Sequence, residues 1–308
     1  MTEAAPLQRR VKPMNTNHVG VVGLGGMGKS LSDSLIAAEH PLAVWDRHTA
    51  RVATTAMIGA TPTTSPRQLA EDSDVVFLTL PNPTAVREVL FKEEDGLVSG
   101  LKDGAIIVDM TTGDAELALE ISERVEALGR GIRYIDAPVS GTSPNLTVMV
   151  GGAVGSLGAA EEIVNDVSGK IIYTGALGKG FSTKLVHQHV KYATHLAVAE
   201  AIVIAEKAGL DVPTVIDAIQ HSSGVAGGLR GVVEYYSDNK RAVAKHAPAT
   251  TIAKDLRLAS ALAESAGVTS ATLAAATEFF AAAAEGDYAT RPYPESTELL
   301  TQLRTQGA

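Results

Sequence analysis

The sequence reads His18-Val19-Gly20-Val21-Val22-Gly23-Leu24-Gly25-Gly26-Met27-Gly28 where a short apolar run meets the spacing Gly-x-Gly-x-x-Gly. A helical pattern follows at once, over residues 27–38. In such a turn Gly23 permits the tight bend, Gly25 lets the backbone approach a pyrophosphate, and Gly28 lets helix and strand pack closely. The helix N-terminus then offers unpaired N–H groups and a positive dipole end to the anion. The stretch therefore predicts dinucleotide binding, against the alternative of a purely structural strand-turn-helix unit.

An acidic residue, Asp46, stands about 20 positions further on, as the dinucleotide-binding pattern requires. It ends a second apolar run, Leu42–Trp45. Its carboxylate can accept hydrogen bonds from an adenosine ribose and would repel a 2′-phosphate, which favours NAD. Arg47 and His48 follow it and could bind that phosphate. We therefore expect NAD as the cofactor, with NADP as the alternative.

Short apolar runs alternate with helical patterns through the first half of the chain, as in βαβ units. Near-continuous apolar strands of this kind imply a parallel sheet covered by helices on both faces. The runs are His18–Gly23, Leu42–Asp46, Val75–Leu80, Ala105–Asp109 and Ile132–Asp136. Two further strands are expected at 147–150 and 170–174, on either side of a helical segment at 156–167. The pattern predicts a doubly wound, Rossmann-type α/β domain over residues 18–180.

The alternation stops near Gly178, and the rest of the chain is helical in pattern. One long helix is expected from Ser182 to Ala208, because its periodicity continues until Gly209. The further helices are expected at 212–221, 249–266 and 269–285, with a glycine-rich loop at 222–228. The chain is thus divided into a mobile tail at 1–17, the dinucleotide-binding domain at 18–180, and an all-helical domain at 181–308 for substrate binding and oligomerisation, joined by the long helix.

Composition excludes several classes of function. The chain has 308 residues, of which 45% are hydrophobic, and a formal net charge of -9. That charge argues against nucleic acid or an anionic membrane as a partner. There are no cysteines, so thiolate catalysis and cysteine-based metal sites are excluded. Since no apolar run reaches the length of a membrane span and the N-terminus has no signal-like apolar core, we expect a cytoplasmic protein.

A stripe of polar residues follows the long helix at spacings of three and four. One reading is a solvated helix face; the other is a stripe that faces the cleft, since Gly178 and Gly180 bring the sheet domain to the start of the helix. The stripe consists of Lys184, His187, Gln188, Lys191 and His195. The histidines lack the i, i+4 spacing of helical metal ligands, so no metal site is predicted.

Several motifs in consistent order make the chain similar to the β-hydroxyacid dehydrogenase family, whose members act on compounds such as 3-hydroxyisobutyrate, tartronate semialdehyde and L-threonate. The resemblance covers residues 18 to 285, and the stretch 184–188 with His195 resembles the L-threonate-type branch most. The motifs are Gly23-Leu24-Gly25-Gly26-Met27-Gly28, Leu80-Pro81-Asn82, Asp136-Ala137-Pro138-Val139-Ser140-Gly141, Leu146-Thr147-Val148-Met149-Val150-Gly151-Gly152, Gly178-x-Gly180-x-x-x-Lys184 and Lys254-Asp255-Leu256.

The resemblance implies a role for each matching position. Lys184 matches the family's catalytic lysine, which would exchange a proton with the substrate hydroxyl. The residues assigned to the substrate are Ser140, Gly141, Thr142, His187, Gln188 and Asp255. The residues assigned to the cofactor are Gly23, Leu24, Gly25, Gly26, Met27, Gly28, Asp46, Arg47, Leu80, Pro81, Asn82, Thr112 and Lys254. Two of these have structural alternatives: Thr112 could cap a helix, and Lys254 could be a surface charge.

The resemblance further implies a small hydroxyacid or semialdehyde as substrate and a homodimer or homotetramer as the assembly. Three departures from the family pattern concern the substrate: the short loop 142–145, Gln188 in place of asparagine, and the ending at 286–292. The rival functions are an imine reductase, against which Lys184 argues, a short decarboxylating enzyme of the 6-phosphogluconate type, which Lys184-x-x-His187 would fit, and a non-catalytic dinucleotide-binding regulator.

Overall fold

The computed structural model describes residues 17–222, 226–237 and 239–299. The predicted tail at 1–17 lies outside this part of the chain, apart from Asn17. The chain divides into two compact units, one ending at Gln188 and the other beginning at His189. Each unit is described by itself.

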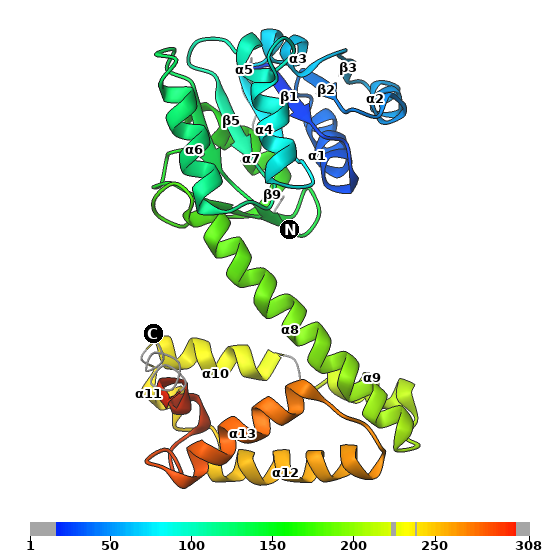
Figure 1. Cartoon of the computed structure of the whole chain (residues 1–308), viewed down its shortest axis with the longest axis vertical. Coiled ribbons are helices and arrows are strands. Elements are labelled where there is room, and N and C mark those ends of the chain that lie inside the picture. Colours follow the sequence, from blue (N-terminus) through cyan, green and yellow to red (C-terminus); the bar gives the residue numbers. More distant parts are fainter. Residues whose placement is uncertain (1–16, 223–225, 238, 300–308) are drawn as a thin grey trace, which may run out of the picture. The chain divides into compact units, whose positions relative to one another are not determined.

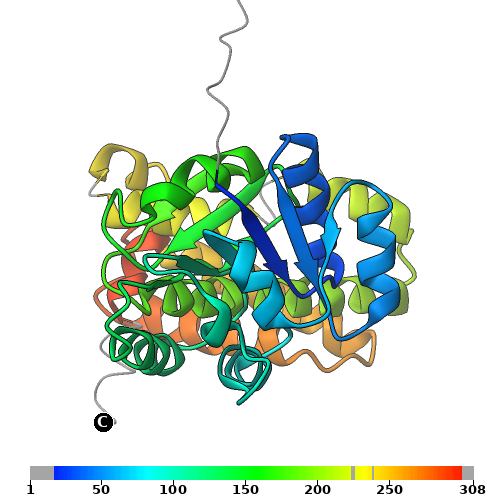
Figure 2. The ribbon, with the colours of Figure 1, turned by 90° about the horizontal axis from the view of Figure 1, so that it is seen from above.

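The first unit contains a six-stranded parallel sheet with the strand order β3-β2-β1-β4-β5-β6. This is the doubly wound order, which reverses between β1 and β4 and so opens a crevice at the carboxyl ends of these strands. Figure 2 shows the dark blue β1 alongside its blue neighbour β2. The strands are β1 (Val19–Val22), β2 (Leu42–Trp45), β3 (Thr61–Pro62), β4 (Val75–Leu78), β5 (Ile106–Asp109) and β6 (Arg133–Asp136). The predicted fold class is confirmed; only the two-residue β3 was not predicted.

Helices cover both faces of this sheet. On β1, β4 and β5, alternate side chains belong to two separate hydrophobic clusters, as the two-residue period of a strand dictates. One cluster packs under α1 and α7, the other under α3, α4, α5 and α6; in Figure 1, α4 and α6 lie in front of the sheet and α7 behind it. The helices are α1 (Gly26–Ala37), α2 (Thr49–Ala56), α3 (Pro66–Asp72), α4 (Pro83–Phe91), α5 (Leu97–Gly100), α6 (Ala115–Glu126) and α7 (Glu161–Val167).

A second, three-stranded sheet follows β6. Strand β8 (Leu146–Val150) pairs antiparallel with β7 (Val139–Ser140) and parallel with β9 (Ser168–Tyr173). Strands β8 and β9 confirm the two expected strands, whereas the two-residue β7 is too short to carry a period and was not predicted. The helical pattern at 156–167 forms a regular helix only from Glu161, after the short 3₁₀ helix η1 (Gly158–Ala160).

The longest helix, α8 (Lys179–Lys207), begins three residues earlier than predicted and crosses the boundary between the units. The regular elements of the second unit, over its described residues, are all helices. Its helices are α9 (Val212–Gln220), α10 (Ala226–Tyr236), α11 (Lys240–Val243), α12 (Ala249–Ser265), α13 (Ala271–Glu285) and the 3₁₀ helix η2 (Tyr293–Ser296). The predicted loop at 222–228 is wrong in part. Residues 226–228 are helical despite their two glycines, because α10 continues into the apolar stretch 229–236; residues 223–225 lie outside the described part.

Candidate active site

The glycine turn between β1 and α1 is fixed by close backbone contacts. Gly23 has a φ of +92°, a conformation that favours glycine, and its carbonyl oxygen accepts a hydrogen bond from Thr79 Oγ1 at 2.6 Å. A Cβ on Gly28 would lie 1.8 Å from that same carbonyl oxygen. A Cβ on Gly25 would meet nothing within 4 Å. Gly23 thus allows the bend of the turn, Gly28 allows the helix to pack closely against it, and Gly25 faces open space.

The N-terminus of α1 suits an anion. Gly25 is its N-cap residue and supplies no side-chain hydrogen bond to the first N–H groups of the helix. Those donors and the positive end of the helix dipole point toward the space beside Gly25 and Gly26. This arrangement fits the pyrophosphate of a dinucleotide, as the sequence predicts.

The predicted ribose ligand, Asp46, is held by the protein itself. Its side chain is 5% exposed. Its carboxylate accepts hydrogen bonds from the backbone N–H groups of Leu24 and His48, both at 2.7 Å, and lies 3.4 Å from Arg51 Nη1. Burial raises the pKa of Asp46, but these hydrogen bonds and the charge of Arg51 outweigh burial, and the pKa lies below its ordinary value. Asp46 thus stays ionised and also ties the glycine turn to the end of β2.

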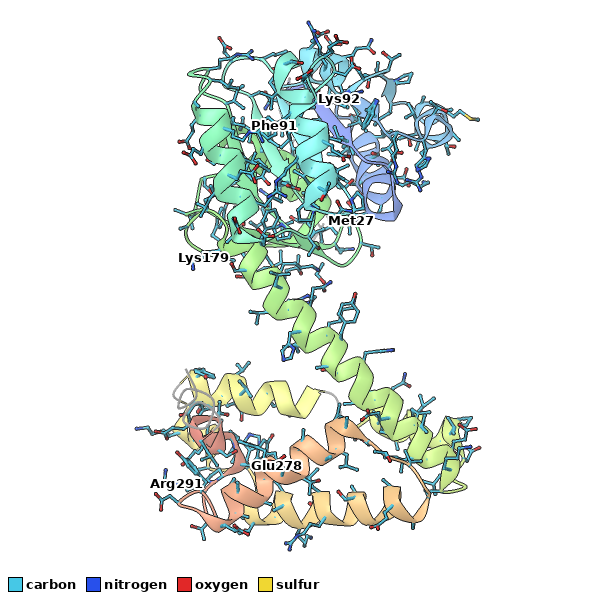
Figure 3. The ribbon with its side chains drawn as sticks, viewed as in Figure 1. Met27, Phe91, Lys92, Lys179, Glu278 and Arg291 are labelled. Atoms are coloured by element: carbon cyan, nitrogen blue, oxygen red, sulfur yellow. The ribbon has the colours of Figure 1, made fainter. Side chains whose placement is uncertain are left out.

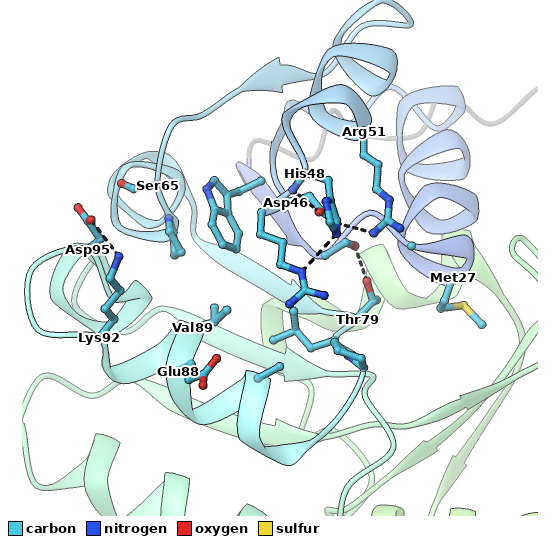
Figure 4. A pocket seen from close by; sticks show the side chains of 18 of the residues that line it. Met27, Asp46, His48, Arg51, Ser65, Thr79, Glu88, Val89, Lys92 and Asp95 are labelled. Carbon is cyan, nitrogen blue, oxygen red and sulfur yellow. Dashed lines mark hydrogen bonds and ion pairs between the residues drawn. The ribbon is translucent and has the colours of Figure 1, made fainter.

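A cavity of about 590 Å³ opens beside the glycine turn (Figure 4). Eight of the residues predicted to bind the cofactor line it: Gly23, Gly25, Gly26, Met27, Asp46, Arg47, Leu80 and Pro81. The sequence reasoning missed the part of the wall that comes from the helices after β2, β3 and β4. These residues include Arg51, Thr64, Ser65, Val89 and Lys92. No motif marks them, because they reach the cavity only through the packing of α2, α3 and α4.

Five other predicted cofactor residues do not line this cavity: four in the first unit, and Lys254 in the second. Leu24 acts through its N–H group on Asp46, and Gly28 packs against the turn. Asn82 caps α4 by accepting a hydrogen bond from the N–H of Ala85 at 2.9 Å. Thr112 is exposed and does not cap α6, because Asp114 does so. The structural alternative for Thr112 is therefore wrong, and its cofactor role stays a prediction.

The carboxyl edge of the sheet also holds a buried acid, Asp109, at the end of β5. Its carboxylate accepts hydrogen bonds from the N–H of Thr111 at 2.9 Å and the hydroxyl of Tyr134 at 2.6 Å. Thr111 Oγ1 in turn accepts a hydrogen bond from the N–H of Leu80 at 3.1 Å. This network joins Leu80, which follows β4 and lines the cavity, to the end of β5 and to β6.

Burial raises the pKa of Asp109 from 3.8 to about 6. Because the pKa is higher in the folded protein than in the unfolded chain, the free energy of unfolding falls as the pH rises from about 4 to above 6. The full decrease is about 3 kcal/mol.

We expect Asp109→Asn, whose side chain stays neutral, to raise the free energy of unfolding by about 1 to 2 kcal/mol at pH 7.5. This gain allows for the loss of a hydrogen bond worth about 1 kcal/mol. No gain is expected at pH 4. Urea denaturation at both values checks this; a difference between the two proteins that does not change with pH would contradict it.

From Lys184 to Gln188, α8 buries polar side chains and exposes apolar ones. Lys184 is 6% exposed, whereas Leu185 and Val186 are 45% and 67% exposed. His187 and Gln188 are half-buried. The alternative that the stripe is a solvated face is therefore wrong in this part of the helix. It holds for Lys191 and His195, which are exposed.

Part of the predicted substrate site comes together in the first unit. Ser140, on β7, lies with its Oγ 3.4 Å from His187 Nε2 on α8. The atoms His187 Nδ1 and Gln188 Oε1 are buried and make no hydrogen bond. Gly141 follows Ser140 with a φ of +94°, and Thr142 is exposed beside it. Buried polar atoms without partners are costly, and a polar substrate is one way to satisfy them.

Lys254 and Asp255 lie in the second unit, on α12. Both side chains are exposed, and Lys254 Nζ lies 3.0 Å from Asp255 Oδ1. This geometry agrees with a surface charge, and their cofactor and substrate roles stay predictions. Across the described part of the chain, no group of three or more histidine and carboxylate side chains could hold a metal ion. The described residues include no helix that combines the length and the apolar character needed to span a bilayer.

Comparisons with known proteins agree with this geometry. Residues 18–175 match the NAD-binding domain of 6-phosphogluconate dehydrogenase, and residues 178–293 match the NAD-binding region of NADP-dependent 3-hydroxyisobutyrate dehydrogenase. The chain is 36% identical over 233 residues to a probable mitochondrial 3-hydroxyisobutyrate dehydrogenase-like protein of Arabidopsis thaliana, which covers 74% of this chain and 67% of that protein.

Two solved structures show the same fold. A 3-hydroxyisobutyrate dehydrogenase of Mycobacterium tuberculosis, solved with L-serine, is 26% identical with a TM-score of 0.61, over 92% of this chain and 99% of that one. An imine reductase of Myxococcus stipitatus in complex with NADP+ has a TM-score of 0.79 over 92% and 99% of the chains, but at 19% identity it shows the fold alone. The family-model matches and the Arabidopsis relative decide the assignment, and the chain belongs to the β-hydroxyacid dehydrogenase family of NAD(P)-dependent oxidoreductases.

Proposed function

We propose that this enzyme oxidises a small β-hydroxyacid, or reduces the matching semialdehyde or keto acid, with Lys184 as the general acid and base. The observation that carries the proposal is the burial of Lys184 on a helix turn whose apolar neighbours are exposed. A lysine buried in this way has given up hydration, which a merely solubilising lysine would keep. The nicotinamide, when bound, supplies or accepts the hydride.

The chain's own residues would orient the substrate and move its proton. Lys184 Nζ would take the hydroxyl proton during oxidation and return it during reduction. The hydroxyl of Ser140, the backbone at Gly141 and Thr142, and the amide of Gln188 would hold the carboxylate. His187, whose Nε2 lies 3.4 Å from Ser140 Oγ, would orient that hydroxyl. Support comes from the buried atoms of His187 and Gln188 that make no hydrogen bond.

A panel of hydroxyacids, semialdehydes and cyclic imines, followed at the nicotinamide absorbance, tests the proposal against its rivals. We expect turnover of one or more small hydroxyacids without release of carbon dioxide. Carbon dioxide release would favour the decarboxylating alternative, which Lys184-x-x-His187 fits. Turnover of imines alone would favour an imine reductase, and cofactor binding without any turnover would favour a regulator.

We expect NADH to be preferred over NADPH, because the ionised carboxylate of Asp46 repels a 2′-phosphate. Arg51 lies 3.4 Å from that carboxylate and lines the cavity. We expect its guanidinium to donate a hydrogen bond to the 2′-phosphate of NADPH when that cofactor binds. Arg51→Ala should therefore lower kcat/KM for NADPH by about tenfold, the loss of one charged hydrogen bond, and change kcat/KM for NADH less. The control is Arg67→Ala on α3, an exposed arginine that pairs with Glu71 and does not line the cavity. An equal loss with both cofactors would contradict the proposed role of Arg51.

For the assembly we propose a homodimer or homotetramer. Support comes from the second unit, whose described residues include exposed large apolar side chains. Those at least 40% exposed include Val203, Leu210, Ile216, Val232, Val233 and Tyr236. Light scattering at micromolar concentration checks the expected mass of two or four chains; a monomer would contradict the proposal. The expected cytoplasmic location stays a prediction, and several curated relatives are named as mitochondrial.

A further inference from the structure

A buried carboxylate, Asp136, lies at the point where β6 ends and α8 begins. It is the last residue of β6 and is 0% exposed. Its Oδ1 accepts a hydrogen bond from the N–H of Gly178, and its Oδ2 accepts one from the N–H of Phe181, both at 2.8 Å. Gly178 directly precedes α8 (Lys179–Lys207), and Phe181 lies in its first turn. A side chain from the sheet therefore caps this helix, a role that a residue of the helix's own N-terminus usually fills.

The glycines around Asp136 are shaped to this carboxylate. A Cβ on Gly151, at the end of β8, would lie 1.8 Å from Asp136 Oδ1. A Cβ on Gly180 would lie 2.8 Å from Asp136 Oδ2 and 2.4 Å from the carbonyl oxygen of Met149. A larger side chain at Gly180 would push the helix away from the sheet, and one at Gly151 would displace the carboxylate of Asp136. Gly180 is thus explained by the close approach of α8 to Asp136, whereas Gly178 is required by its φ of +82° and by Ala115, which its Cβ would meet at 3.0 Å.

The same helix face carries Lys184. Residues four apart on a helix lie one above the other, so Lys184 continues the face on which Gly180 meets Asp136. The burial of Lys184 agrees with this placement, since its neighbours Leu185 and Val186 are exposed. The rotation and the height of α8 at Asp136 therefore decide where the lysine amine lies.

We propose that Asp136 is a positioning residue, which sets the place of the Lys184 amine by holding the first turn of α8 against the carboxyl edge of the sheet. The inference rests on the proposed function of Lys184. Two charge-assisted hydrogen bonds and the positive end of the α8 dipole favour the ionised form of Asp136. Burial opposes these effects and raises the pKa of Asp136 above its ordinary value. The ionised carboxylate that holds α8 therefore lowers the free energy of unfolding.

The test is Asp136→Asn, which keeps the shape of the side chain and removes one of its two acceptors. The amide NH₂ would face an N–H donor of α8, so one hydrogen bond is lost and the first turn shifts. We expect kcat to fall by about tenfold to 100-fold, as for a catalytic group displaced by about 1 Å. The dissociation constant of NADH should change by less than about twofold, because Asp136 does not line the cavity beside the glycine turn. The pH at half-maximal kcat should also move, because the lysine amine takes a new environment.

Asp74→Asn is the control. Asp74 directly precedes β4 at the amino edge of the sheet, where its carboxylate accepts hydrogen bonds from the N–H of His18 and from Lys102 Nζ, both at 2.9 Å. Neither partner lies on α8, and Asp74 does not line the cavity beside the glycine turn. The control should keep kcat and its pH profile. A second variant, Gly180→Ala, displaces α8 from its own side and leaves the carboxylate intact. It should lower kcat in the same way, and it answers the question if Asp136→Asn does not fold.

The outcomes separate this inference from the proposed function. If Lys184→Ala is inactive while Asp136→Asn and Gly180→Ala keep the kcat and the pH profile of the parent enzyme, the positioning role is overturned and the function stands. If Lys184→Ala keeps turnover, the proposed function itself fails. A loss of thermal stability in Asp136→Asn with unchanged kcat and pH profile would show a structural role only, and would likewise overturn the inference.

Discussion

Replacing Lys184 with alanine is expected to lower kcat by about 100-fold to 10,000-fold, the range that general acid–base catalysis contributes. Lys184 is 6% exposed, and His187, three residues further along the same helix, lies with its Nε2 3.4 Å from Ser140 Oγ. Without the amine, the proposed site has no general base for the proton of the substrate hydroxyl. The dissociation constant of NADH should change by less than about twofold, since Lys184 does not line the cavity beside the glycine turn.

Steady-state kinetics and a titration of NADH fluorescence measure the two quantities separately. The control is Lys179→Ala, which removes an exposed lysine from the first position of the same helix (Figure 3). It should retain kcat. Turnover by Lys184→Ala at the parent rate would contradict the role of Lys184 as the general acid and base. An equal loss of kcat in both variants would indicate damage to the helix rather than loss of an acid–base group.

The second large effect is expected in the glycine turn. Alanine at Gly28 should mainly lower the stability of the protein, whereas alanine at Gly25 should mainly lower the affinity for NADH. An alanine Cβ at Gly28 would lie 1.8 Å from the carbonyl oxygen of Gly23 and 2.4 Å from Thr79 Oγ1. The nearer atom is backbone and cannot yield without moving the turn. Gly28→Ala should therefore lower the free energy of unfolding by about 3 kcal/mol, the upper range for overpacking, and should weaken cofactor binding as a consequence.

Gly25→Ala is the matched variant in the same turn. Its Cβ would meet nothing within 4 Å, and the φ of Gly25 is −64°, which alanine adopts freely. Stability should change by less than about 1 kcal/mol, the difference between glycine and alanine at an N-cap. The methyl group would nevertheless occupy space that the pyrophosphate approaches, so the affinity for NADH should fall by about tenfold or more.

Urea denaturation and NADH titration of the two variants give a two-by-two comparison. The expected pattern is an unstable protein for Gly28→Ala and a stable protein that binds NADH weakly for Gly25→Ala. A stable Gly28→Ala protein would contradict the packing role assigned to that glycine. Unchanged NADH affinity in Gly25→Ala would contradict the placement of the pyrophosphate at this helix terminus.

The doubly wound sheet could be predicted because its signals are local. Each strand from β1 to β6 except β3 has four residues with apolar residues at its centre, and the glycine spacing marks the first crossover. The two-residue strands β3 and β7 carry no period and exist only because a neighbouring strand pairs with them. Helix α10 was missed because its glycine-rich start argues locally against a helix, and α11 was missed because its four residues are too few to carry a helical period.

Residue types and spacing by themselves determined the fold class, the glycine turn, the acid at the end of β2 and the family motifs around Lys184. Only the tertiary structure decided that the polar side of α8 is the buried one near Lys184, that Asp46 is held by the backbone N–H groups of Leu24 and His48, and that Asp136 caps α8 from the sheet. The physical reason is range. Periodicity and turn chemistry act between residues a few positions apart, whereas burial and the contact of Asp136 with Phe181, 45 residues away, arise only when distant segments pack together.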